Sequence, residues 1–115
     1  MPTVIASFGY RYDGPPRLPK KARALVIDVR HILHRNPYRN KRLRELRGDD
    51  PAVQADILKT PGFAESYQTL KARVSMWPGE VYLGCTGGHH RSVFLADRLA
   101  HELGCPVVHL HYRHK

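Results

Sequence analysis

The sequence contains little cysteine and no long apolar run. Its two cysteines, Cys85 and Cys105, form no Cys-x-x-Cys pair, which excludes the disulfide framework of a small secreted domain. No stretch approaches the ~20 apolar residues that are needed to cross a bilayer. The first residues, Met1 to Thr3, lack the basic and apolar regions of a secretion signal. We therefore expect a cytoplasmic protein that does not contact membranes.

Acidic residues are also scarce. Asp and Glu number 10 against 19 Lys and Arg, so the formal net charge is +9 over 115 residues. Such an excess of cations attracts polyanions and releases their counterions, although solubility alone can also explain a basic composition. Hydrophobic residues make up 42% of the chain, which is ordinary for a folded domain. We expect one domain over residues 1–115, and the position of the charges must indicate its partner.

Apolar patterning predicts the fold class. Short runs rich in β-branched residues predict strands at residues 4–8, 24–29, 80–84 and 107–111. The run at 24–29 is almost continuously apolar, which is typical of a strand buried on both faces. Residues 80–111 have the order strand, loop, helix and strand, which predicts a parallel β-α-β unit. We therefore expect a small single-domain α/β sandwich with a mostly parallel sheet.

Three helices have clear start or stop signals. The dipeptides Asp50-Pro51 and Thr60-Pro61 each match an N-cap followed by proline at the first helical position. Apolar residues between positions 63 and 77 recur at spacings of four and three, which indicates an amphipathic helix. A third helix is predicted over residues 92–103, with Gly104 as its C-terminal cap.

The segment from Gly84 to Ser92 has the composition of an anion-binding loop at the start of a helix. Backbone N–H groups at a helix N-terminus lack partners within the helix and are available to an anion. Adjacent glycines let the backbone curl around a phosphate, and arginine, hydroxyl and imidazole groups add donors. The alternative is a tight turn that needs glycine only for its geometry. The candidate phosphate ligands in this segment are Thr86, Gly87, Gly88, His89, His90, Arg91 and Ser92.

Two further pairs of residues are candidates for ligand contact. Asp28 and Arg30 lie at the end of a predicted strand, where the ligand crevices of α/β proteins open; a local salt bridge between them is the alternative. His109 and His111 alternate along the last predicted strand, a spacing that metal sites use. No cysteine or carboxylate lies beside them in the sequence. We expect a solvated strand end there, and neither a metal ion nor a cofactor.

Cys85, Arg91 and Ser92 also have the spacing of a cysteine-dependent phosphatase loop. In that chemistry a thiolate attacks phosphorus while the arginine holds the phosphate oxygens. Gly84 stands where the tyrosine phosphatases place a histidine, and no aspartate lies in an obvious general-acid loop. Binding without turnover is therefore our leading interpretation, and catalysis by Cys85 and Arg91 is the alternative.

Most of the excess positive charge falls between residues 30 and 47, where Glu45 is the only acid. Asn36-Pro37 interrupts any regular element, which predicts a basic loop that follows a phosphate backbone. A solvated loop, or contact with an acidic patch of a second subunit, is the alternative. The candidate RNA-binding residues are Arg35, Arg39, Lys41, Arg42, Arg44 and Arg47.

Several motifs resemble the C-terminal domain of the RNase adaptor protein RapZ family. The loop Gly84-Cys85-Thr86-Gly87-Gly88-His89-His90-Arg91-Ser92-Val93 is similar to the signature of that domain, and Ile5-Ala6-Ser7-Phe8-Gly9 is similar to its opening strand. Asp28-Val29-Arg30, Leu43-Arg44-Glu45-Leu46, Gly48-Asp49-Asp50 and Arg113-His114 extend the similarity over nearly the whole chain. The full-length adaptor also carries a Walker A loop, which this sequence lacks, so nucleotide hydrolysis is not expected.

The resemblance implies a domain that binds a small regulatory RNA through basic residues and senses an amino-sugar phosphate at the loop. It also implies that Thr86, Gly87, Gly88, His90 and Arg91 form the phosphate pocket. We therefore expect a regulatory domain that binds RNA and a phosphorylated small molecule and that can form a homo-oligomer. A metabolite-binding module that never contacts RNA is a further alternative.

Overall fold

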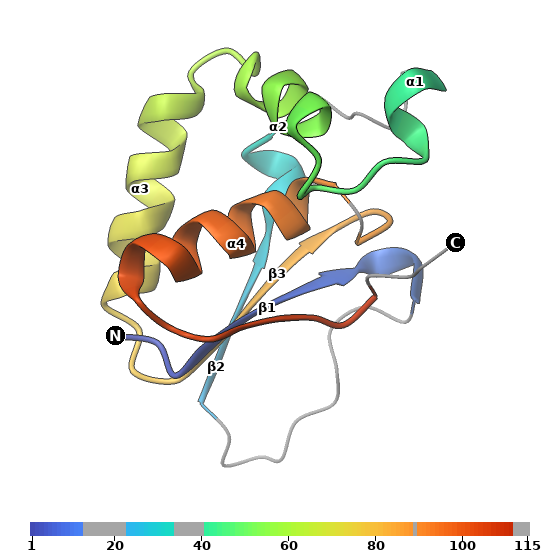
Figure 1. The fold of residues 1–115 in the computed structure, drawn as a ribbon. Coiled ribbons are helices and arrows are strands. Elements are labelled where there is room, and N and C mark those ends of the chain that lie inside the picture. The colour runs from blue at the N-terminus through green and yellow to red at the C-terminus, as the bar shows by residue number, and fades with distance from the viewer. Residues whose placement is uncertain (13–22, 34–40, 89, 112–115) are drawn as a thin grey trace.

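Four strands form one sheet in which every pairing is parallel (Figure 1). The strands are β1 (Val4–Gly9), β2 (Ala24–Asp28), β3 (Glu80–Cys85) and β4 (Val107–His109). Their order across the sheet is β2-β3-β1-β4. The computed structural model describes residues 1–12, 23–33, 41–88 and 90–111. The predicted α/β fold with a parallel sheet is confirmed.

The sheet differs from the sequence prediction in its strand order and in the burial of one strand. The predicted unit over residues 80–111 is present, but β1 lies between β3 and β4. The expectation that residues 24–29 form a strand buried on both faces is wrong. Among the described strands, β2 lies at the edge of the sheet beside β3, and Val26 is 40% exposed. A short apolar run cannot distinguish a central strand from an edge strand, because both bury at least one face.

Helices connect the strands, and the structure confirms one of the two predicted N-caps. The described helical elements are η1 (Tyr10–Tyr12), η2 (Val29–His31), α1 (Lys41–Arg44), α2 (Pro51–Leu58), α3 (Phe63–Ser75) and α4 (Arg91–Leu103). The N-cap prediction for α2 is confirmed, since Asp50 Oδ1 accepts a hydrogen bond from the Ala52 N–H at 2.9 Å. The predicted start of α3 at Pro61 is wrong, because Gly62 adopts a left-handed backbone with φ of 73° and the helix begins at Phe63, two residues after Pro61. Gly104, with φ of 70°, ends α4 as predicted.

The short helix α1 lies in the segment that was expected to be a loop. Its residue Leu43 is only 8% exposed and packs into the main core. Lys41 and Arg42 remain exposed on its surface. One buried leucine thus holds a basic helical turn against the body of the protein.

The helices α2, α3 and α4 cover one face of the sheet. Alternate residues of a strand point to opposite faces, and Ile5, Val81 and Leu83 point to the face on which α4 packs. Figure 1 shows α4 crossing the sheet with α3 beside it. The opposite face carries a smaller cluster that includes Phe8 and Tyr82. Within the described residues, no helix combines the length and hydropathy that would cross a membrane.

A chain of side-chain hydrogen bonds holds the edge strand β4 in place. His109 Nε2 lies 2.8 Å from Asp97 Oδ1 on α4, and His109 Nδ1 lies 2.6 Å from Ser7 Oγ on β1. A carboxylate can only accept, so Nε2 donates to Asp97, while Nδ1 shares a hydrogen bond with the serine hydroxyl. Ser7 has no exposed surface, so this Ser-His-Asp set fastens β4 and presents no accessible nucleophile. His111 Nδ1 accepts from the Gly9 N–H at 2.8 Å.

Candidate functional site

The carboxyl ends of three neighbouring strands meet at the loop that sequence analysis singled out. The register pairs Phe8 with Gly84 and Gly9 with Cys85, while Asp28 of β2 also pairs with Gly84. The loop then leads directly into α4. The fold therefore brings Asp28 and the residues after Gly84 to one edge of the sheet, as predicted from strand ends alone.

Close backbone approach between β1 and the loop requires two glycines. Gly88 has φ of +73°, and a Cβ there would lie 2.7 Å from the Gly9 nitrogen. A Cβ on Gly9 would lie 2.6 Å from the carbonyl carbon of Gly87. The Arg11 N–H also donates to the Thr86 carbonyl at 3.0 Å. The end of β1 therefore holds the loop in one conformation, and both Thr86 and Gly87 stay partly exposed.

Cys85 lies beneath this loop and is 2% exposed. Its Sγ accepts a hydrogen bond from the Gly88 N–H at 3.3 Å and lies 3.2 Å from the Ser92 hydroxyl. Ser92 is fully buried, so its hydroxyl points into the protein and not toward solvent. The two side chains join the end of β3 to the first turn of α4.

The first turn of α4 has no side-chain cap. His90 occupies the N-cap position without forming a capping hydrogen bond, in contrast to Asp50 at the start of α2. The Phe94 N–H donates to the His90 carbonyl at 2.9 Å, which leaves the preceding N–H groups of the turn without helical partners. Gly48 packs directly on this turn, since a Cβ there would lie 2.4 Å from the His90 oxygen. His89 lies outside the described residues.

The His90 side chain is 7% exposed and lies against the segment that carries α1. Burial lowers the pKa of His90, and the positive charge of Arg91 lowers it further. Backbone groups of Leu46, Arg44 and Leu43 act in the opposite direction on this pKa. Nε2 forms no hydrogen bond of ordinary geometry with the described part of the chain.

The lowered pKa of His90 predicts a loss of stability in mild acid. At pH values below 6.5, the ordinary pKa of histidine, His90 binds a proton more readily in the unfolded chain than in the folded chain. The free energy of unfolding should therefore hold steady above pH ~7 and fall as the pH drops below ~6.5. We expect His90→Gln to lose less stability than the wild type between about pH 7 and pH 5. Urea denaturation across this range would measure the difference, with His101→Gln on the exposed end of α4 as the control. Identical slopes for wild type and His90→Gln would contradict this assignment.

Arg91 is buried, at 5% exposure. Its Nη1 atom donates a hydrogen bond to the Leu33 carbonyl oxygen at 3.0 Å. Sequence analysis placed this guanidinium on a phosphate, whereas in the structure at least one of its donors joins α4 to Leu33, which lies within the basic segment. Guanidinium has five donors, so this bond does not use up its capacity.

Asp28 and Arg30 form the local ion pair that was the alternative to ligand binding. Arg30 Nε and Nη2 donate to the two Asp28 carboxylate oxygens at 2.9 and 2.7 Å. The hydrogen bonds from Arg30 hold the pKa of Asp28 below its usual range. The guanidinium also lies over the Tyr10 ring, 4.3 Å from its centroid. Asp28 pairs with Gly84 in the strand register, and the Arg30 side chain is 38% exposed.

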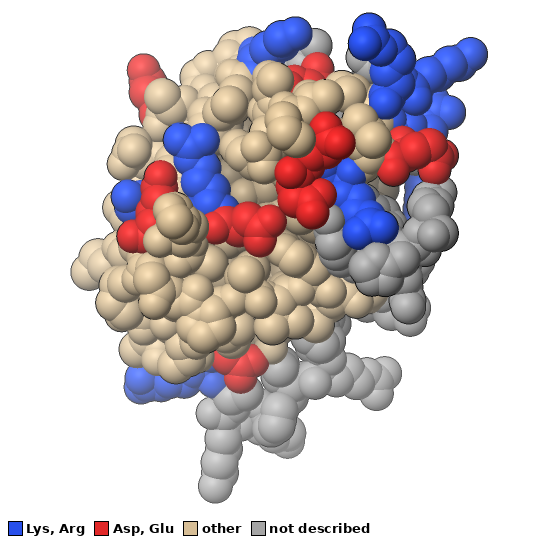
Figure 2. Space-filling model, viewed as in Figure 1, with Lys and Arg blue, Asp and Glu red and all other residues tan. Residues whose placement is uncertain are grey.

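The described part of the basic segment lies on the surface. Lys41 and Arg42 are exposed, and Arg44 and Arg47 are half-buried. Figure 2 shows lysine and arginine side chains gathered at the end of the molecule where Figure 1 places α1. The predicted RNA ligands Arg35 and Arg39 lie outside the described residues. No group of three or more potential metal ligands is present in the ranges that the structure describes.

Sequence reasoning missed the residues that support the site from a distance. Gly48 covers the first turn of α4, and the Leu33 carbonyl holds Arg91. Asp97 and Ser7 complete the hydrogen bonds of His109. No local pattern could indicate these contacts, because each joins residues that are far apart in the chain.

Comparisons with known proteins point to one family. A family model described as the RapZ C-terminal domain matches residues 1–115. A nucleotide-binding protein of Rhodospirillum rubrum is 39% identical, with 96% of this chain and 36% of the relative aligned. A nucleotide-binding protein of Limosilactobacillus fermentum is 40% identical over 95% of this chain and 39% of its own length. A nucleotide-binding protein of Stutzerimonas stutzeri is 34% identical over 97% of this chain and 40% of its own length. The chain thus spans between 36% and 40% of the length of these relatives.

Proposed function

Because the chain belongs to the RapZ C-terminal domain family, we propose that it is a regulatory domain that binds a phosphate group at the loop between β3 and α4. The observation that carries this proposal is the uncapped first turn of α4 beside the buried His90. N–H groups that have no acceptor within the helix, together with the helix dipole, favour a negative charge at that point. Thr86 and Gly87 are the partly exposed residues through which an anion reaches it.

A phosphorylated small molecule, such as an amino-sugar phosphate, is the proposed ligand. The partly exposed backbone of the loop would contact the phosphate. Arg30, which is paired with Asp28, lies at the end of the neighbouring strand β2. The relatives are named nucleotide-binding proteins, and a nucleotide would present the same phosphate chemistry to the loop. Calorimetric titration with inorganic phosphate, an amino-sugar phosphate and the unphosphorylated amino sugar tests this. Equal affinity for the sugar with and without phosphate would rule the proposal out.

RNA is the proposed second ligand, bound through the basic segment. The family resemblance suggests it, and the exposed cations of α1 together with the net charge of +9 support it. A helical turn held by Leu43 presents Lys41 and Arg42 to solvent. These side chains can reach phosphates without disturbing the core.

Salt dependence tests the RNA contact directly. Each phosphate contact with a single strand contributes roughly 0.7 to the slope of log K against log salt. We expect Lys41→Ala/Arg42→Ala to weaken RNA binding and to flatten the slope by roughly 1.4, while phosphate affinity at the loop stays unchanged. Arg23→Ala/Arg73→Ala removes the same charge from exposed positions elsewhere and should have a smaller effect. Filter binding at several salt concentrations measures both. A double variant with the wild-type slope would favour a metabolite-binding module that does not contact RNA.

Catalysis by Cys85 is the alternative use of the same loop. The Gly88 N–H and the Ser92 hydroxyl beside Sγ are groups that stabilise a thiolate. Against turnover, Sγ is nearly inaccessible and Arg91 donates to the Leu33 carbonyl. Hydrolysis of an aryl phosphate that disappears in Cys85→Ser would establish the enzymatic function in place of binding alone.

A further inference from the structure

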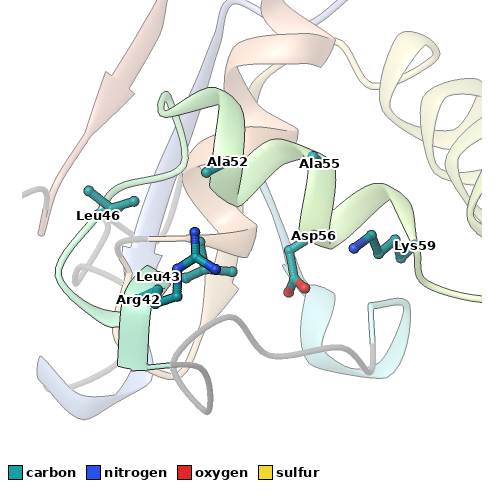
Figure 3. Close-up of a pocket in the computed structure, with 7 residues that line it drawn as sticks. All are labelled: Arg42, Leu43, Leu46, Ala52, Ala55, Asp56 and Lys59. Atoms are coloured by element: carbon teal, nitrogen blue, oxygen red, sulfur yellow. The ribbon is translucent and has the colours of Figure 1, made fainter.

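A pocket of about 260 Å³ lies between α1 and α2, apart from the phosphate loop (Figure 3). Its lining residues are Arg42, Leu43, Leu46, Ala52, Ala55, Asp56 and Lys59. Three of them come from α2 and Lys59 is its C-cap; their spacing of i, i+3, i+4 and i+7 places them on one face of that helix. The space exists because Ala52 and Ala55 are small and the leucines opposite do not fill the gap. Pockets for drug-sized ligands occupy roughly 300–1,000 Å³, so this one suits a single small group.

The chemistry of the pocket combines apolar walls with three charged side chains. Figure 3 shows Asp56 extending from α2 and Arg42 from α1 into the space between the helices, with Lys59 at the far end. Asp56 is 8% exposed, whereas Arg42 and Lys59 are exposed. The pocket therefore has a carboxylate inside and cations at its rim.

This arrangement discriminates between possible occupants. An apolar side chain of a protein partner would offer no anionic group to Arg42 and Lys59 at the rim of the pocket. An unpaired nucleobase supplies both flat apolar faces and N–H donors, and its flanking phosphates match Arg42 and Lys59. A carboxylate has about four lone-pair sites, so a partner within the protein leaves Asp56 able to accept from a base.

We infer that the α1–α2 pocket receives one unpaired RNA base, with guanine preferred through Asp56; this rests on the RNA-binding function proposed above. The Watson–Crick edge of guanine presents two adjacent donors, N1–H and N2–H, which match the two oxygens of a carboxylate. Adenine and cytosine each present a donor beside an acceptor, and uracil presents one donor between two acceptors. Only guanine avoids placing an acceptor against Asp56.

The experiment measures anisotropy of labelled U-rich hexanucleotides whose central base is guanine, adenine, cytosine or uracil. A bidentate contact to a base discriminates by ~1–3 kcal/mol, so we expect the wild type to bind the guanine oligonucleotide about tenfold more tightly. Ala55→Leu fills the pocket and should abolish this preference. Ala72→Leu makes the same change on the exposed surface of α3 and should preserve it.

Asp56→Asn keeps the shape of the side chain and replaces one acceptor by a donor, so it should move the preference from guanine toward adenine. Circular dichroism of each variant would show that the fold is retained. RNA binding without base preference in the wild type, or a guanine preference that survives Ala55→Leu, overturns the pocket assignment alone. No binding of any oligonucleotide overturns the RNA function as well. Tight binding of 5′-GMP without an oligonucleotide preference assigns the pocket to a free nucleotide instead.

Discussion

Gly88→Ala is expected to abolish phosphate binding at the loop and to lower the free energy of unfolding by about 2–4 kcal/mol. Gly88 has a left-handed backbone, and its added Cβ would lie 2.7 Å from the Gly9 nitrogen. Relief of this clash requires the loop and β1 to separate. The N–H groups that converge on an anion would then lose their common direction.

Gly62→Ala is the matched control for this prediction. Gly62 has the same φ of +73°, but a Cβ there meets no atom within 4 Å. It should cost only the left-handed backbone penalty of about 1 kcal/mol and leave phosphate affinity unchanged. Thermal denaturation and calorimetry with inorganic phosphate measure the two effects. Equal destabilisation by both variants would mean that the approach of β1 to the loop is not tight.

Arg91→Ala is expected to lower the free energy of unfolding by about 3 kcal/mol and to remove phosphate binding. The change leaves a cavity beside α4 and deprives the Leu33 carbonyl of its donor at 3.0 Å. The charge lost also lies at the helix end to which we assign the anion. Arg73→Ala, on the exposed face of α3, should change stability by less than about 0.5 kcal/mol.

Arg91→Met separates the structural role of this residue from its role toward phosphate. Methionine keeps much of the buried volume, so its effect on stability should be smaller than that of alanine. Phosphate affinity should nevertheless be lost, because the positive charge is gone. If Arg91→Met binds phosphate as tightly as the wild type does, the guanidinium serves only to hold the Leu33 carbonyl.

The amino-acid sequence by itself determined the elements of the fold and the place of the loop. Short apolar runs rich in β-branched residues located the strands, and Asp50 and Gly104 marked helix ends that the structure confirms. These signals are local: a cap or a period acts within one or two turns of chain. The loop composition after Gly84 likewise needed no tertiary information, because glycine, hydroxyl and basic residues lie within nine positions of one another.

Tertiary structure alone decided how these pieces act together. It placed β1 between β3 and β4, made β2 an edge strand and turned Arg91 toward Leu33. It also brought α1 against α2, so that Asp56 and Arg42 line one pocket. Each outcome depends on contacts between distant residues, whose formation reflects the packing of the whole core. Local propensity does not determine such contacts, so the direction of a side chain such as Arg91 depends on how the helices pack on the sheet.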